Sequence, residues 1–370
     1  MSRNTGSVAS SDKSWLKLYA AVAVLPLVLT ACGGGGGGGG SPTPPLTPTP
    51  SPSPTPAPTP APTPAPTPSP ASPTIGSTWA NAAVSGAGNL TGVDYADGHF
   101  VAVSDTGAAV ASTDGVTWTP IPLLTSTVST DHLKAYAVTH LGNTLIAAGS
   151  VSSAPYTTST GAVATSSDGT TWTMSSMPAG ATPIHGLIGD TTKAIALGES
   201  GHIYASTNGS AWSLVTTAPG AGTLNAGTYG NNMYVGVGDN GYIIKSVDGV
   251  VWGSAQVIVV GGTGINLHGV AWTGSQYVAV GDNATITLSP DGTHWGALRT
   301  SAIPGTLRAV AVASNGTIVV VGDNGIETST DGNTWTARND SGVAALAGAT
   351  FGNSEFVAVG QASAVKTSSN

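Results

Sequence analysis

Two sets of polar side chains recur along most of the chain, and their residue types could support binding or acid–base chemistry. The first set follows a repeated Leu or Ile at the start of successive apolar runs: Thr91, Lys134, His185, Asn225, His268, Arg308 and the apolar member Ala347. The second set occupies tight turns: Asp105, Glu199, Asp239, Asp282 and Asp323, with Ser150 and Gln361 where the acid is missing. Because only 8% of the residues are charged, a cluster of these groups could form a ligand site.

Two explanations compete for these residues. Asp-Asn-Gly is a favourable hairpin turn and strand starts are usually solvated, so both sets could be structural. Longer connections favour a functional role, because loops on a rigid scaffold often carry binding residues. The segments 120–132 and 150–160 are longer than their counterparts. We therefore expect a partner near Lys134, Tyr156 and His185.

The elements that must position these residues are repeats. A motif Ser-x-Asp/Asn-Gly-x-x-Trp occurs in six complete copies, with Trp-to-Trp spacings of 54, 40, 40, 43 and 40 residues. Its acid or amide and Trp are Asp114 and Trp118, Asp168 and Trp172, Asn208 and Trp212, Asp248 and Trp252, Asp291 and Trp295, and Asp331 and Trp335. Each copy follows two β-rich runs around a tight turn, and no segment has a helical period. This period indicates propeller blades.

The two ends of the repeat region complete one another. Ser368, Ser369 and Asn370 begin a motif that Gly76 to Trp79 would finish. A ring closed in this way leaves no free sheet edge, whereas an open solenoid needs capping repeats. The sequence therefore predicts an all-β, single seven-bladed β-propeller over 76–370, whose last blade takes its outermost strand from the N-terminal side.

The motif resembles the Asp-box, or bacterial neuraminidase, repeats of sialidase-like propellers and of photosystem II assembly factors. Every copy here is one residue shorter between the acid and the Trp than the usual box. The residue types account for a structural role: the acid accepts backbone N–H groups in a turn, the Gly tolerates positive φ, and the Trp buries apolar area between strands. The resemblance also implies that the boxes lie on the face opposite the two polar sets.

A sialidase would need an arginine cluster. Residues 32–370 contain only Arg299, Arg308 and Arg338, and they have no Arg-Ile-Pro signature. We expect Arg299 and Arg338 on outer strands. We therefore predict a binding or scaffolding module for an envelope protein or glycan, without catalysis. The alternative is a glycoside hydrolase that uses two of the turn carboxylates. We expect no cofactor and no metal site, because the seven His residues are scattered and the chain has one Cys.

The first 75 residues have the pattern of an export signal followed by a linker. Arg3, Lys13 and Lys17 precede an apolar run from Leu18 to Ala31, which is typical of a signal peptide over 1–31. The sequence around Cys32 resembles a bacterial lipobox, although an ordinary signal peptide beside a chance Cys is the alternative. The resemblance implies a lipidated Cys32 and, since no acidic residue follows it, the outer membrane of the cell envelope.

The segment 32–75 holds an unbroken glycine run and, over 41–74, 16 of the 25 prolines. It predicts a disordered, semi-rigid spacer that reaches on the order of 100 Å as polyproline II. A proline-rich ligand for a recognition domain is the other interpretation. The net charge of −8, with 10 Lys plus Arg, argues against a nucleic-acid partner. We expect a monomer held at the membrane by its lipid.

Overall fold

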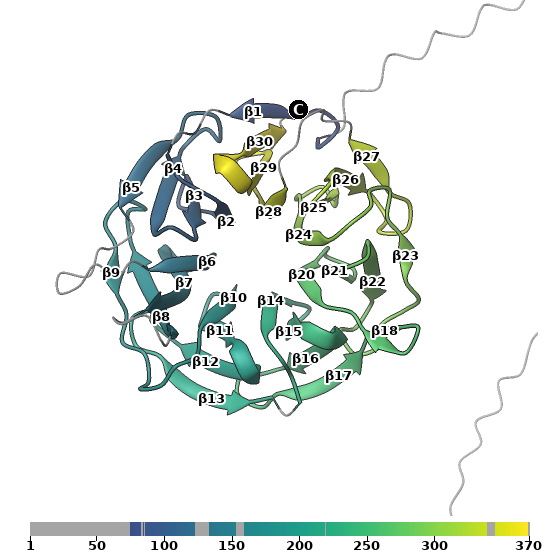
Figure 1. Ribbon diagram of the computed structural model, residues 1–370, viewed down its shortest axis with the longest axis horizontal. Helices are drawn as coiled ribbons and strands as arrows, with labels where there is room; N and C mark the ends of the chain where they lie inside the picture. The colour runs from purple at the N-terminus through teal and green to yellow at the C-terminus, as the bar shows by residue number, and fades with distance from the viewer. Residues whose placement is uncertain are drawn as a thin grey trace, which may run out of the picture. The chain divides into compact units, whose positions relative to one another are not determined.

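The computed structural model describes residues 75–82, 84, 86–122, 133–152, 159–218, 220–338 and 345–368. These residues form seven four-stranded antiparallel sheets and one two-stranded hairpin. The seven sheets stand around a ring as the blades of a β-propeller (Figure 1). The predicted fold class and the blade number are therefore confirmed.

Each blade contains its four strands in order from the ring's inside to its rim. Blade 1 holds β2 (Leu90–Ala96), β3 (His99–Ser104), β4 (Ala108–Ser112) and β5 (Thr119–Pro122), and blade 2 holds β6 (Lys134–Leu141), β7 (Thr144–Ser152), β8 (Ser159–Ser166) and β9 (Thr173–Met174). Blade 3 holds β10 (Ile184–Gly189), β11 (Ala194–Gly198), β12 (His202–Ser206) and β13 (Ser213–Thr217), and blade 4 holds β14 (Leu224–Gly230), β15 (Met233–Gly238), β16 (Tyr242–Ser246) and β17 (Gly253–Val257).

The hairpin of β18 (Val259–Val260) and β19 (Thr263–Gly264) leads into the remaining blades. Blade 5 holds β20 (Leu267–Trp272), β21 (Tyr277–Gly281), β22 (Thr285–Ser289) and β23 (Arg299–Thr300), and blade 6 holds β24 (Leu307–Val312), β25 (Ile318–Gly322), β26 (Gly325–Ser329) and β27 (Thr336–Arg338). Blade 7 holds β28 (Leu346–Gly352), β29 (Glu355–Gly360), β30 (Val365–Ser368) and, outermost, β1 (Ala80–Ala82). Short 3-10 turns lie at η1 (Glu199–Gly201), η2 (Asp239–Gly241) and η3 (Gln361–Ser363).

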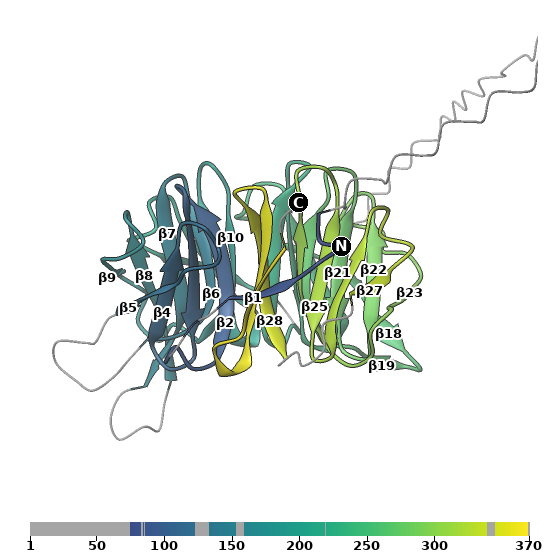
Figure 2. The ribbon, with the colours of Figure 1, turned by 90° about the horizontal axis from the view of Figure 1, so that it is seen from above.

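The closure of the ring through its two ends is confirmed. Strand β1 pairs antiparallel with β30, with Ala80 opposite Thr367 and Ala82 opposite Val365. The Gly76 N–H donates to the Ser368 Oγ at 3.1 Å, which joins the two halves of the divided motif. Figure 2 shows β1 alongside the blade formed by the C-terminal strands. Asn370, which the sequence places at the Asp/Asn position of this seventh motif, lies outside the described residues.

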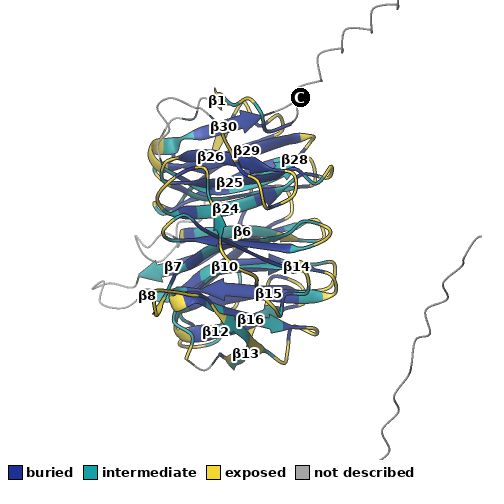
Figure 3. Ribbon diagram, turned by 90° about the vertical axis from the view of Figure 1, so that its right-hand side faces the viewer, coloured by how far each residue is buried: buried dark blue, intermediate teal, exposed yellow. Residues whose placement is uncertain are grey.

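The core of the molecule lies between blades. Seven hydrophobic clusters each combine residues of two adjacent blades, so each blade is held by both neighbours. Trp212 of blade 3, for example, belongs to a cluster with Ile146 and Val163 of blade 2. Buried residues line the strands, while exposed residues gather at the turns (Figure 3). The motif Trp therefore packs between blades, a wider contact than the packing between strands that the sequence predicts.

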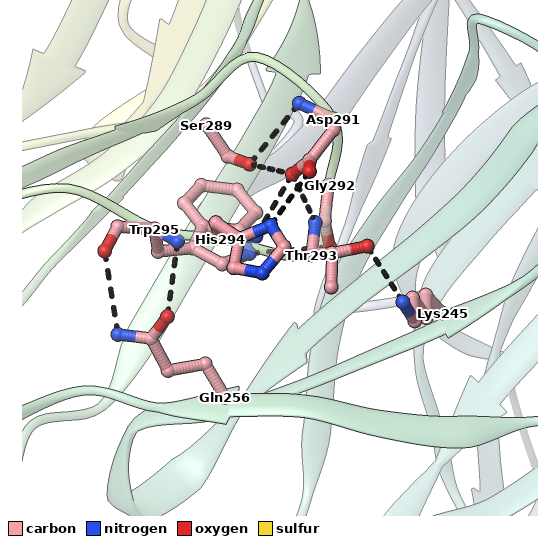
Figure 4. A network of polar contacts seen from close by, with 8 residues as sticks. All are labelled: Lys245, Gln256, Ser289, Asp291, Gly292, Thr293, His294 and Trp295. Carbon is pink, nitrogen blue, oxygen red and sulfur yellow. Dashed lines mark hydrogen bonds and ion pairs between the residues drawn. The ribbon is translucent and has the colours of Figure 1, made fainter. Parts of the chain in front are cut away.

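The turn that carries the repeated motif, which we call the box turn, is held by its own side chains. In blade 5, the Asp291 Oδ1 accepts the N–H groups of Thr293 and His294, both at 2.8 Å, and the Ser289 hydroxyl at 3.2 Å. Two side chains of blade 4 form hydrogen bonds with this turn (Figure 4). Lys245 Nζ donates to Thr293 Oγ1 at 2.6 Å, and Gln256 Oε1 accepts the Trp295 N–H at 2.9 Å. The box turn therefore orders its own loop and locks adjacent blades together.

The glycines of the box turns have positive φ. The box glycines, such as Gly292 with φ of 68°, adopt the left-handed conformation that the sequence predicts. Within the described ranges, no helix is long and apolar enough to cross a membrane.

Candidate binding site at one end of the channel

All seven innermost strands contain a β-bulge close to their first residue. In blade 3, Ile184 pairs with Gly198 and Gly186 pairs with Leu197, so His185 is an extra residue without a partner opposite. The same shift occurs in each of the remaining six blades. The bulge residues are Thr91, Tyr136, His185, Asn225, His268, Arg308 and Ala347. A bulge redirects its side chain and is common at the rims of barrels and next to functional sites.

The bulge residues line one cavity at the axis of the ring. This cavity has a volume of about 190 Å³, and all seven innermost strands contribute to its wall. Small residues follow each bulge because the strands crowd together there. A Cβ on Gly186 would lie 2.9 Å from the Cα of Ala226 in the next blade. We call this set of bulge residues the bulge ring.

Six of the seven predicted positions of the first polar set belong to the bulge ring, and one needs correction. In blade 2, Ala135 pairs with Gly149 and Ala137 with Ala148, which makes Tyr136 the bulge residue. Lys134 instead pairs with Ser150, is exposed and does not line the cavity. Tyr136 is therefore the residue that sequence reasoning missed. Tyr156 lies outside the described residues.

The second polar set holds the first in place, blade by blade. His185 Nε2 lies 3.2 Å from Glu199 Oε1, and His268 Nε2 lies 2.9 Å from Asp282 Oδ1. Asn225 Nδ2 donates to Asp239 Oδ1 at 3.0 Å, and Arg308 Nε donates to Asp323 Oδ1 at 2.7 Å. Four blades thus repeat one arrangement, in which the carboxylate of the inner turn binds the bulge side chain.

The other three blades vary this arrangement. The hydroxyl groups of Tyr136 and Ser150 lie 3.3 Å apart, so Ser150 takes the place of the acid in blade 2. Thr91 donates to the Ala135 carbonyl of the next blade at 2.7 Å, while Asp105 Oδ2 accepts from Asn89 at 3.2 Å. Blade 7 has the apolar Ala347 on its bulge, with Gln361 in the turn.

The bulge ring also carries an aromatic surface. The rings of Tyr136 and His185 stack with their centroids 5.1 Å apart and their planes within 4° of parallel. This pair joins blades 2 and 3 beside the cavity. A flat aromatic face of this kind can pack against an apolar or cationic group of a ligand.

The charge of this end of the channel is acidic. Five carboxylates of the inner turns outnumber the cations Arg308 and Lys134 here, but none of them lines the cavity, whose wall instead carries Arg308, His185 and His268. Burial alone would raise the pKa of Asp282, but the hydrogen bond and charge of His268, together with the Thr306 hydroxyl, hold it below its usual value. Negative charge therefore lies behind the bulge ring and not in the wall of the cavity.

The opposite end of the channel lies beside the box turns. Each innermost strand starts at the bulge ring and runs toward the other face, and the third strand of each blade runs in the same direction. The box turns follow the third strands, so they lie away from the bulge ring, as the sequence predicts. Arg299 and Arg338 lie on the outermost strands β23 and β27, so they share no pocket with Arg308.

Two buried carboxyl groups outside the bulge ring have a raised pKa. Burial raises the pKa of Glu327, and burial together with the charge of Asp114 raises that of Glu355. Neither residue lines the channel cavity. No group of three or more His, Cys, Asp or Glu residues within the described ranges could hold a metal ion.

The fold and site define a seven-bladed propeller with a polar ring at one end of its channel, and solved propellers resemble it. A catalytically inactive virginiamycin B lyase from Staphylococcus aureus, in complex with quinupristin, has a TM-score of 0.65 and 12% identity, covering 79% of this chain and 99% of its own. YCF48 bound to a D1 peptide has a TM-score of 0.60 and 16% identity, with coverages of 79% and 95%.

The WD40 propeller domain of Doa1 has a TM-score of 0.62 and 11% identity, and covers 80% of this chain and 97% of its own. No protein-family model matches the chain, and no curated protein matches its sequence. At these identities the likeness establishes the propeller fold, while function has to be argued from the site.

Proposed function

We propose that the propeller is a non-catalytic binding or scaffolding module that holds a protein segment at the bulge ring. The observation that carries the proposal is the repeated pairing of a bulge side chain with a turn carboxylate in blades 3, 4, 5 and 6. Turn chemistry alone does not require a hydrogen-bonding residue on the bulge. Preorganised side chains around a shared cavity are typical of recognition sites.

The charges around the cavity favour a ligand with basic side chains. The carboxylates of the inner turns outnumber Arg308 and Lys134 and would attract Lys or Arg side chains to the rim of the cavity. The stacked Tyr136–His185 pair offers a face for the aliphatic part of such a side chain. YCF48, one of the similar propellers, has been solved bound to a D1 peptide, which supports a peptide rather than a glycan as the partner. A glycoside hydrolase would need a pair of carboxyl groups facing its substrate, and none of the described carboxyl groups lines the channel cavity.

Fluorescence anisotropy with labelled peptides of one length tests this proposal. Lys-rich, uncharged and Glu-rich peptides are compared on the parent, on Asp282→Asn and on the control Asp97→Asn. Both variants remove one negative charge, but Asp97 is exposed in the turn after β2, away from the bulge ring. We expect preferred binding of the Lys-rich peptide, a several-fold loss with Asp282→Asn and no change with Asp97→Asn. Equal binding of all three peptides would refute the proposed ligand class.

We also propose that the chain is a lipoprotein of the bacterial envelope, anchored through Cys32 in the outer membrane. The support is the order of a basic segment, an apolar run and the chain's single Cys. Metabolic labelling with a radioactive fatty acid should mark the parent and fail to mark Cys32→Ser. Label on both proteins would exclude Cys32 as the lipidated residue.

A further inference from the structure

A second cavity lies at the far end of the innermost strands and has a different chemical character. Its volume is about 270 Å³, and its walls come from the last residues of β14, β20, β24 and β28. Three of its residues are aromatic, namely Tyr229, Trp272 and Phe351, and the others are Ala, Val and Thr. No charged side chain lines it. We call it the aromatic cavity.

Each aromatic side chain of this cavity is held by a second aromatic ring on the neighbouring strand. The ring centroids of Trp272 and Tyr277 are 4.6 Å apart, and those of Phe351 and Phe356 are 4.9 Å apart. Tyr229 lies in the same way on Tyr234, at 4.6 Å. These supports fix the cavity's rings before any ligand binds, which lowers the entropic cost of binding.

Glycine makes room for the largest of these rings. A Cβ on Gly230 would lie 2.2 Å from the Cγ of Trp272, so only glycine permits the indole to lie over the end of β14. Tyr229 remains 38% exposed despite its aromatic contacts. The cavity therefore presents a fixed and accessible apolar surface, which is unusual at the end of a packed core.

The N-terminal side of the chain enters between blades 6 and 7, in a hydrophobic cluster that extends to the wall of this cavity. Ile75, the first described residue, is 5% exposed and belongs to the same hydrophobic cluster as Ala311. Ala311 lines the aromatic cavity, and Phe351 packs against that cluster. The eight residues before Ile75 read Thr-Pro-Ser-Pro-Ala-Ser-Pro-Thr and carry no charge. They begin at Thr67 and end at Thr74.

We infer that the aromatic cavity binds the proline-containing segment 67–74 of the same chain. Polyproline II segments dock on aromatic-lined grooves, because their rigid backbone loses little entropy and their carbonyl groups are free to accept hydrogen bonds. The hydroxyl groups of Thr228, Tyr229 and Thr350 can donate to those carbonyls. At about 3.1 Å per residue, eight residues extend about 25 Å, so the segment before Ile75 has the length to extend across the box-turn face toward the cavity.

Charge and position both favour this occupant. The uncharged segment matches the uncharged cavity, whereas the bulge ring carries the charged Arg308 and is bordered by the carboxylates of the inner turns. The segment enters on the face of the box turns, because Gly76 completes the box turn of blade 7. Docking there leaves the bulge ring, on the other face, free for its ligand.

The test follows the indole N–H signal of Trp272 by NMR in the full chain, with the signal assigned from Trp272→Phe. One variant replaces Pro68, Pro70 and Pro73 by Ala. The control replaces Pro52, Pro54 and Pro56 by Ala, which changes composition equally outside the segment. The Trp79 indole, which donates to the Gly76 carbonyl at 3.0 Å, is the reference for intact folding near the entry point.

We expect the Trp272 signal to shift in the first variant and to stay unchanged in the control, while the Trp79 signal stays unchanged in both. A synthetic peptide of residues 67–74 should bind the first variant about tenfold more tightly than the parent, since the tethered segment competes at high effective concentration. Identical Trp272 signals in parent and variant would overturn the inference. A parent signal that changes on dilution would also overturn it, because a second copy would then be the occupant.

Discussion

Replacement of Trp212 by Ala should destabilise the propeller by about 4 kcal/mol. Trp212 is 7% exposed, packs between blades 2 and 3, and donates its indole N–H to the Gly209 carbonyl at 2.8 Å. A buried Trp removes about 150–250 Å² from water, worth roughly 4–6 kcal/mol at about 25 cal/mol per Å² as an upper bound. Measured Trp-to-Ala costs of about 3–5 kcal/mol agree with this range.

Thermal melting followed by circular dichroism measures the effect. A domain of about 300 residues has an unfolding entropy near 0.6 kcal/mol/K, so about 4 kcal/mol lowers the melting temperature by roughly 6–7 °C. The matched comparison is Trp252→Ala. Trp252 occupies the same motif position but is only half-buried, and its indole nitrogen has no hydrogen-bond partner in the part of the chain that the structure describes. We expect this variant to lose less. A Trp212→Ala melt within about 1 °C of the parent would refute the assignment of the motif Trp to the core between blades.

Further predictions concern the same framework. Trp172→Phe should cost about 1 kcal/mol less than Trp212→Phe in urea denaturation, since the buried indole nitrogen of Trp172 has no hydrogen-bond partner among the described residues. The Thr117 and Val116 N–H groups hold the pKa of Asp114 at about 2. The stability that this lowered pKa gives is present above the usual value of 3.8 and is lost as the pH falls toward 2. Asp114→Asn keeps an acceptor oxygen but does not titrate, so its melting temperature should fall less between pH 5 and pH 2 than that of the parent. The raised pKa of Glu355 means that stability is lost as pH rises above 4.5, so Glu355→Gln should gain in melting temperature over the parent between pH 4 and 7. Deletion of Ala80–Ala82 exposes the edge of β30 and should cause self-association in size-exclusion chromatography. An unchanged measurement in any of these cases would contradict the corresponding contact.

The fold could be predicted from the sequence because its determinants are local and repeated. Each motif supplies a turn acid, a glycine with positive φ and a Trp, and the divided motif at Gly76 and Ser368 discloses which ends meet. A turn of this kind depends on a few adjacent residues, so its position can be predicted from the sequence alone. The packing of the Trp between blades was harder to predict, since it depends on the neighbouring blade.

The position of the first polar set at the starts of the innermost strands could be predicted from the sequence, except in blade 2. Leu133 and Ala135 are both buried and stand two residues apart, so the sequence offers two equivalent alignments of the strand start. Only the pairing with Gly149 and Ala148 on β7 decides between them and selects Tyr136 over Lys134. Bulge position is set by strand register, which a single sequence specifies weakly. The aromatic cavity escaped prediction because its residues close four separate strands.

Site-specific photo-crosslinking in the native envelope tests the central claim most directly, namely that the partner binds at the bulge ring. A photoreactive phenylalanine analogue replaces Tyr136 in one protein and the exposed Tyr229, at the other end of the channel, in a second. The account predicts a discrete adduct with another protein from position 136 and none from position 229. An adduct from position 229 alone, or from neither position, would contradict it.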